Sequence, residues 1–372
     1  MKRRFKQLHI VLALISGLFI LNASITGSLL VFGKELQQLL QPDLWTIAPD
    51  NKSVDIVAVV KGISQTAQEQ GLKIEQISIE EKPDRPWVIT VSNAVQWNFN
   101  PYTEKVIHRY PKGQDFYHKI MSWHRWLLME DNATKSWARY ITSSAALILI
   151  IEIVLGYMLW FNSKKARRKY RRSGKNNWRL RIRQFHISVG VYTGIVLILV
   201  AFTGLSFHWP TAPLYEAATF SAMEPRPKLE PVTKGGLDQL DVALQQAGTH
   251  LPDAALRRIY FPKQEGESLL LRMQYPDESA PFSYLWIDGG SGHVLGVQDS
   301  SKLSRANRLW NFKYAFHIGD FGGGVTKALW LLFALLPGLF VVSGLWLFLS
   351  MSFKRKGILL HHFKFNQPEI PR

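Results

Sequence analysis

Four long apolar stretches alternate with two polar segments along the chain. The polar segments cover residues 33–139 and 210–326 and have the composition of ordinary soluble protein. The apolar stretches cover about residues 8–32, 140–161, 186–209 and 327–351. Each is long enough for the roughly 20-residue helix that crosses a hydrocarbon core of about 30 Å. The pattern predicts an α-helical membrane protein with four transmembrane helices and two extramembrane segments.

The first and third apolar stretches repeat one another. They read "QLHIVLALISGLFILNASITG" (7–27) and "QFHISVGVYTGIVLILVAFTG" (184–204). Both place a histidine, a glycine and a Thr-Gly pair at identical spacings: His9, Gly17, Thr26 and Gly27 in the first, and His186, Gly194, Thr203 and Gly204 in the third. Such self-similarity predicts a tandem duplication of one structural unit.

The polar segments follow the same plan. "VQWNFNPYTEKVI" (95–107) and "SYLWIDGGSGHVL" (283–295) both read as a strand, a tight turn and a second strand. A helical pattern precedes each, near 54–70 and 236–248. We therefore expect each polar segment to form a small α+β domain.

A further histidine follows each of these domains and precedes a span. His124 lies in "MSWHRWLLM", thirteen residues before Trp137. His317 lies in "YAFHIGDFGG", thirteen residues before Trp330. The repeating unit is thus a helix, a domain, a histidine-bearing segment and a second helix.

The positive charge is concentrated on one predicted side of the membrane. The net charge is +17, and 20 of the 45 basic residues lie in residues 1–7, the loop 162–185 and the tail 352–372. These segments contain one acid, Glu369. By the positive-inside rule, both termini and the loop are cytoplasmic, and the two domains face the other side. A nucleic-acid partner is not needed to explain the charge. The first stretch is too long for a signal-peptide core and no A-x-A site follows it, so we interpret it as an anchor.

The chain has no cysteine, which excludes disulfides, iron–sulfur ligation and covalent c-type haem. Parallel repeats imply a pseudo-two-fold axis along the membrane normal. Such an axis brings His9 towards His186 near the cytoplasmic surface, and His124 towards His317 near the outer one. Two facing imidazoles are typical axial ligands of six-coordinate haem iron. Zinc and copper also bind neutral imidazole, but they usually take a third or fourth protein ligand.

Other residues leave alternatives open. His208 is a reserve ligand for the outer site, although its counterpart in the first half is Val31. Arg125 and Arg183 are candidate partners of haem propionates, or else membrane-surface charges. Gly17, Gly27, Gly194 and Gly204 could leave room for a haem macrocycle, but we prefer the interpretation that they allow the helices to pack closely. Trp123 and Trp126 favour the aromatic belt over a haem contact. Glu152 is the one clear acid within a predicted span. It is either a functional residue, in a proton relay or a quinol contact, or a neutral residue hydrogen-bonded to Ser143, Ser144 or a neighbouring helix.

With these features the sequence resembles a known family, the PepSY-associated transmembrane proteins. The family includes iron-regulated inner-membrane proteins and haem-containing ferric-siderophore reductases. The resemblance covers nearly the whole chain. It rests on "LHIVLALISG…TG" (8–27), "WHRWLL" (123–128), "FHISVGVYTG…TG" (185–204) and "FHIGDFGG" (316–323), with turns similar to those of PepSY domains at "NPYTEKV" and "DGGSGHV". Tyr102–Glu104 departs from the family's smaller turn residues, which affects the hairpin alone.

The resemblance implies four transmembrane helices and two periplasmic α+β PepSY-like domains in a bacterial inner membrane. It also implies two non-covalent b-type haems, an inner one held by His9 and His186 and an outer one held by His124 and His317. The expected activity is electron transfer to a periplasmic ferric siderophore. The chain has no G-x-G-x-x-G or P-loop, so the donor is expected to be another molecule, a quinol or a cytoplasmic flavin reductase.

Two other functions remain open from the residues. One is a non-redox regulator whose outer domains restrain a peptidase or sense a ligand, which predicts no chromophore and dispensable histidines. The other is a divalent-metal transporter that uses the same histidines. That reading expects more polar residues along the spans than Asn22, Ser24, Thr26 and Glu152 supply.

Overall fold

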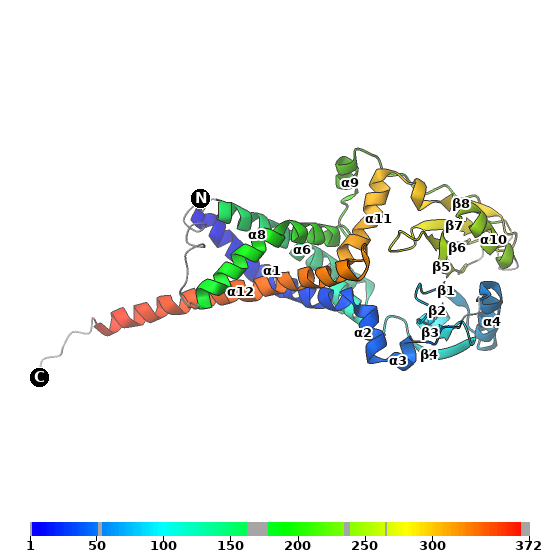
Figure 1. Cartoon of the computed structure of the whole chain (residues 1–372), viewed down its shortest axis with the longest axis horizontal. Helices are drawn as coiled ribbons and strands as arrows, with labels where there is room; N and C mark the ends of the chain where they lie inside the picture. The colour runs from blue at the N-terminus through cyan, green and yellow to red at the C-terminus, as the bar shows by residue number, and fades with distance from the viewer. Residues whose placement is uncertain (1, 51–53, 162–177, 234–238, 265, 366–372) are drawn as a thin grey trace, which may run out of the picture. The chain divides into compact units, whose positions relative to one another are not determined.

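The computed structural model describes residues 2–50, 54–161, 178–233, 239–264 and 266–365, the last of these ranges by its backbone alone from residue 351. The chain divides into two compact units. The membrane unit comprises Met1–Val31, Met121–Pro210 and Gly324–Arg372. The sheet unit comprises Phe32–Ile120 and Thr211–Gly323. Figure 1 labels the elements of both.

Four helices of the membrane unit are long and apolar enough to cross a membrane, which confirms the four predicted spans. They are α1 (Lys2–Val31), α6 (Asn132–Phe161), α8 (Trp178–Leu205) and α12 (Gly323–Phe365). α6 and α8 begin eight residues before the predicted spans. The hydropathy pattern marks only the part of a helix inside the hydrocarbon, whereas the helix itself continues through polar residues outside it. α12 also runs past the predicted end at 351. Residues 162–177 of the predicted basic loop lie outside the described residues, as do residues 366–372 of the tail.

α1 and α12 are joined where Pro337 interrupts the backbone ladder of α12. The Ser24 hydroxyl of α1 donates to the Ala334 carbonyl and accepts from the Gly338 amide, at 3.0 Å in the second case. Those two groups would bond each other in an uninterrupted helix. The serine therefore inserts into the ladder and satisfies the groups that the proline separates.

The sheet unit is built on one antiparallel sheet of eight strands, in the order β4-β3-β2-β1-β5-β6-β7-β8. The first polar segment contributes β1 (Ile74–Ser78), β2 (Trp87–Val91), β3 (Val95–Asn100) and β4 (Lys105–Pro111). The second contributes β5 (Ala255–Tyr260), β6 (Leu269–Gln274), β7 (Ser283–Ile287) and β8 (Val294–Gln298). β1 pairs with β5, with Ile77 opposite Ile259, so the two segments share one sheet.

One face of the sheet forms the core with two helices. Ile77, Ile89 and Leu285 are fully buried on this face. They belong to one cluster with residues of α4 (Ile56–Glu69) and α10 (Leu240–His250). These are the helices predicted near 54–70 and 236–248. The predicted strand pairs are β3–β4 and β7–β8, whereas β1, β2, β5 and β6 were not predicted.

The remaining helices of the described ranges are short. They are α2 (Gly33–Leu40), α3 (Pro42–Trp45), α5 (Phe116–Trp126), α9 (Ala212–Thr219) and α11 (Arg305–Ile318), with 3-10 turns at Ser92–Ala94 and Ser300–Lys302. α5 and α11 carry the histidines that the sequence places before the second and fourth spans.

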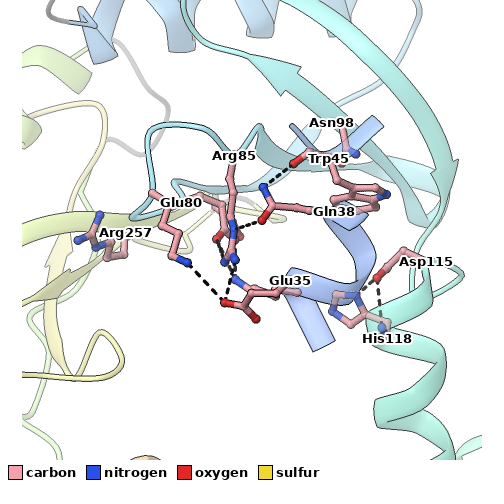
Figure 2. Close-up of polar contacts among 12 residues, drawn as sticks. Glu35, Gln38, Trp45, Glu80, Arg85, Asn98, Asp115, His118 and Arg257 are labelled. Atoms are coloured by element: carbon pink, nitrogen blue, oxygen red, sulfur yellow. Dashed lines mark hydrogen bonds and ion pairs between the residues drawn. The ribbon is translucent and has the colours of Figure 1, made fainter. Parts of the chain in front are cut away.

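Arg85 fastens α2 to the first half of the sheet (Figure 2). Its guanidinium donates to Glu35 Oε1 and to Gln38 Oε1, both at 3.1 Å, and lies 3.9 Å from Glu80. Its side chain is only 10% exposed. Gln38 in turn donates to the Trp45 carbonyl, which ties α3 into the same network.

We expect Arg85→Ala to lower the free energy of unfolding by about 2 kcal/mol, because it leaves half-buried acceptors without their donor. Lys82→Ala is the matched control, since Lys82 is 55% exposed and reaches Glu35 only at 3.5 Å. Melting followed by tryptophan fluorescence in detergent measures both. Equal shifts for the two variants would show that the Arg85 network contributes nothing beyond surface charge.

Candidate functional site

The membrane unit brings His9 of α1 and His186 of α8 together. Their ring centroids lie 6.4 Å apart and the ring planes are nearly perpendicular, at 84°. The repeat predicts this meeting, because equivalent positions of two parallel repeats face one another across their axis. Both histidines are partly buried within apolar helices. The structure therefore contains a paired-imidazole site between α1 and α8.

The orientation of the His186 ring is set by Ser343 of α12. His186 Nδ1 lies 2.8 Å from Ser343 Oγ, and that hydroxyl also donates to the Phe340 carbonyl at 3.2 Å. We assign the ring proton to Nδ1, because a hydroxyl that donates its one proton to a carbonyl can only accept from the ring. The lone pair is then on Nε2. An outer hydrogen bond of this kind orients a metal-binding histidine and increases its basicity.

His9 lies in a different environment. Its buried Nδ1 has no hydrogen-bond partner in the described part of the chain, and the backbone of Glu152 lies beside the ring. Glu152 is 8% exposed, and the single hydroxyl of Ser16 lies within hydrogen-bond distance of both the Leu12 carbonyl, at 2.9 Å, and Glu152 Oε1, at 3.3 Å. The sequence left Ser143, Ser144 or a neighbouring helix as partners of Glu152. The structure shows a partner on a neighbouring helix, Ser16 of α1.

His124 is held by α1 in the same manner as His186 is held by α12. Its Nδ1 lies 2.8 Å from Thr26 Oγ1, and the threonine hydroxyl donates to the Asn22 carbonyl at 2.6 Å. Thr26 is fully buried. By the same reasoning, the His124 proton is on Nδ1 and the lone pair on Nε2.

A hydroxyl residue followed by glycine marks both of these histidine contacts. A Cβ on Gly27 would meet His124 Cε1 at 3.3 Å, and a Cβ on Gly344 would meet His186 Cε1 at 3.3 Å. The hydroxyl orients the ring and the glycine leaves room for it. Sequence reasoning noticed Thr26-Gly27 without assigning this role and missed Ser343-Gly344. By contrast, Gly17 faces Val341 and Gly194 faces Tyr157 and Ile153, so those two serve helix packing.

The remaining histidine candidates are not brought into a described pair. His317 is the next-to-last residue of α11, which ends at Ile318 with Gly319 as its left-handed C-cap. It belongs to the sheet unit, whereas His124 belongs to the membrane unit. Their pairing stays a prediction. His208 packs edge-on against Tyr140, with ring centroids 4.5 Å apart, and its buried Nε2 has no hydrogen-bond partner among the residues described.

The two candidate partners of haem propionates, Arg125 and Arg183, lie in different surroundings. The Arg125 guanidinium lies over the Trp126 ring, 5.0 Å from the centroid. Arg183 is exposed on α8, three residues before His186. Trp123 is 40% exposed. Arg125 is thus part of an ordered cluster, and the position of Arg183 fits a membrane-surface charge equally well.

Lys313 of α11, one turn before His317, was not predicted as a site residue. Its side chain is buried and its Nζ lies 2.8 Å from the Trp310 ring centroid. Burial lowers the pKa of Lys313 to about 7. A sequence offers no signal for such a residue, because a lysine in an amphipathic helix normally faces solvent.

We expect stability to rise with pH between about 7 and about 10, because in that range the unfolded lysine holds a proton that the folded one has lost. Lys313→Met should flatten this dependence and stabilise the protein at pH 8 by about 2 kcal/mol. Melting temperatures at several pH values measure both effects. Lys61→Met, at an exposed position of α4, is the control. An unchanged pH profile in Lys313→Met would contradict the assignment.

Comparison with known proteins supports one family. A family model described as the PepSY-associated TM region matches residues 6–350. The match includes all four spans, both histidine-bearing helices and the whole sheet. No curated protein matches the sequence.

Proposed function

The chain belongs to the PepSY-associated transmembrane family, and from that membership and the histidine geometry we propose that it is a dihaem b-type oxidoreductase of the bacterial inner membrane. It would pass electrons across the membrane to a periplasmic ferric siderophore. The single observation that carries the proposal is the pair His9 and His186, two imidazoles 6.4 Å apart within the apolar membrane unit.

The spacing of this pair is compatible with one metal ion that both imidazoles would hold. Imidazole nitrogens bind metals at roughly 2 Å, so ring centroids 6.4 Å apart leave room for such an ion between the rings. His9 Nδ1, which has no hydrogen-bond partner among the described residues, and His186 Nε2 would supply the lone pairs. No cysteine is present to compete as a ligand.

A haem held by this pair supplies one-electron transfer at its iron. The residues of the chain do the rest. His9 and His186 hold the group, and Ser343 keeps the His186 ring in one tautomer and one orientation. The apolar helices around the pair exclude water, which favours ligation by neutral imidazole. Glu152, whose backbone lies beside His9 and whose carboxyl contacts Ser16, is a candidate holder of a proton.

The second site of the proposal uses His124 and His317. Thr26 orients the His124 ring as Ser343 orients His186, and this parallel supports the same kind of ligation at both. The tandem duplication, the periplasmic position of the sheet unit and the cytoplasmic termini follow from the repeat and the charge distribution. In this proposal electrons would enter near His9 and leave near His124. Reduction of ferric iron weakens its binding to hard oxygen chelators and frees the metal.

The test is the visible spectrum of the purified protein, oxidised and then reduced with dithionite, with haem counted per chain. We expect a Soret band, a sharp α-band on reduction and about two haems per chain. Reoxidation on addition of a ferric siderophore would establish the direction of transfer. A colourless protein from haem-replete cells would contradict the proposal and favour a regulatory role for the sheet unit.

A further inference from the structure

Three cations surround one indole at the junction of α5 and α6. The Trp126 ring centroid lies 5.0 Å from the Arg125 guanidinium and 5.5 Å from both Lys135 Nζ and the Arg139 guanidinium. Any two of these cations are therefore at most about 11 Å apart, a range over which physiological salt screens their repulsion only in part. Within the described ranges, neither Lys135 nor Arg139 forms an ion pair with a carboxylate.

Several polar atoms in this region are buried without a partner. Trp126 Nε1, Arg139 Nε and His208 Nε2 are inaccessible to solvent and make no hydrogen bond among the described residues. Arg139 interacts with both of the other residues. Its guanidinium lies over the Trp126 ring, and its charge adds to burial, the larger cause, in lowering the pKa of His208. A buried unsatisfied donor costs about 1–3 kcal/mol, so a folded protein retains several together only where something satisfies them.

The turn that holds Trp126 is strained. Leu127 and Leu128 both adopt positive φ, 52° and 63°. Consecutive left-handed residues with branched side chains are unusual, because the Cβ of each crowds the backbone. The Leu127 amide bonds the Trp123 carbonyl and the Leu128 amide bonds the Ser122 carbonyl, which folds the turn back under α5. Strain of this kind is typical of ligand-binding segments.

We propose that Trp126, Arg139 and His208 form a binding site for an anionic oxygen group, a carboxylate or a phosphate, with Arg125 and Lys135 supplying further positive charge. An indole N–H and a guanidinium N–H are donors without acceptor capacity, so they require an acceptor. Charge-assisted hydrogen bonds to an oxyanion would satisfy both and would offset the repulsion among the cations.

Two molecules bring such a group to this place. One is a haem propionate, a reading that rests on the proposed function and makes His208 a donor to the anion instead of an iron ligand. The other is the phosphate of a membrane lipid at the end of α6. The chemistry of the site is the same for both.

The experiment compares Arg139→Gln, Trp126→Phe and His208→Gln with Arg181→Gln, which removes an exposed arginine at the other end of the membrane unit. Trp126→Phe keeps a ring beneath the cations and removes only the N–H donor. In the first arm, each protein is reconstituted with haem or with haem dimethyl ester, and release to excess apomyoglobin is timed. In the second arm, each protein is taken from nanodiscs containing anionic and zwitterionic lipid, and retained lipid is counted by native mass spectrometry.

If a propionate occupies the site, the ester should leave the unmodified protein at least tenfold faster than haem, and Arg139→Gln should bring the ratio close to one. If a lipid phosphate occupies it, the ester and haem should behave alike, and the three variants should lose a retained anionic lipid that Arg181→Gln keeps. Either result supports the site. A colourless protein would overturn the proposed function and leave the lipid arm to decide. Variants that match Arg181→Gln in every arm that applies would overturn the anion site.

Discussion

His186→Ala is expected to halve the haem content of the purified protein, from about two groups per chain to about one. His186 is the better ordered of the inner pair, because Ser343 fixes its ring and Gly344 gives it room. Alanine leaves His9 alone, and a single axial imidazole holds haem far more weakly than two. The remaining spectrum should be that of the outer site. Haem quantification and the reduced α-band measure both properties.

The controls separate ligation from general damage. Ser343→Ala keeps the imidazole and removes only its hydrogen-bond acceptor, so we expect haem to bind about 10–100-fold more weakly, in line with other outer-shell losses. His250→Ala removes an exposed histidine of the sheet unit and should change nothing. Full haem content in His186→Ala would exclude His9–His186 as a haem site.

Gly27→Val is expected to displace His124 and to remove haem from the outer site while the inner site stays occupied. A Cβ at this position already meets the His124 ring at 3.3 Å, and the two methyl groups of valine extend beyond it. The ring would have to leave Thr26, which breaks the bond that orients it. Overpacking of this kind usually costs about 1–3 kcal/mol even where the neighbours adjust.

Gly156→Val is the matched control, since a Cβ at that glycine of α6 meets nothing within 4 Å. Thr26→Val tests the hydroxyl separately, because it preserves the volume and removes the acceptor for His124 Nδ1. The same spectra, with melting temperatures to check folding, distinguish the cases. An intact outer-haem signal in Gly27→Val would mean that His124 is not a ligand in its observed position.

The contacts around the histidines show how far the sequence alone predicts the two sites. The repeat predicted that His9 meets His186, since symmetry alone relates equivalent positions on parallel helices. It did not reveal Ser343, because nothing in the repeated pattern marks this serine of α12 as the partner of His186. Nor did it reveal Arg139 and Trp126 as partners, because their contact depends on the strained turn at Leu127 and Leu128.

Hydropathy and charge by themselves determined the four spans, their number and their expected orientation, because water, lipid and the cytoplasmic charge rule act on composition over about 20 residues. The internal repeat determined which histidines to compare. Only the tertiary structure decided that β1 and β5 join the two polar segments into one sheet, since strand pairing between distant segments depends on edges that no local pattern marks. Only the tertiary structure, likewise, decided that Ser24 completes the ladder at Pro337 and that Thr26 and Ser343 orient the histidines. These are contacts between helices, made by single hydroxyl groups whose direction depends on how the helices pack.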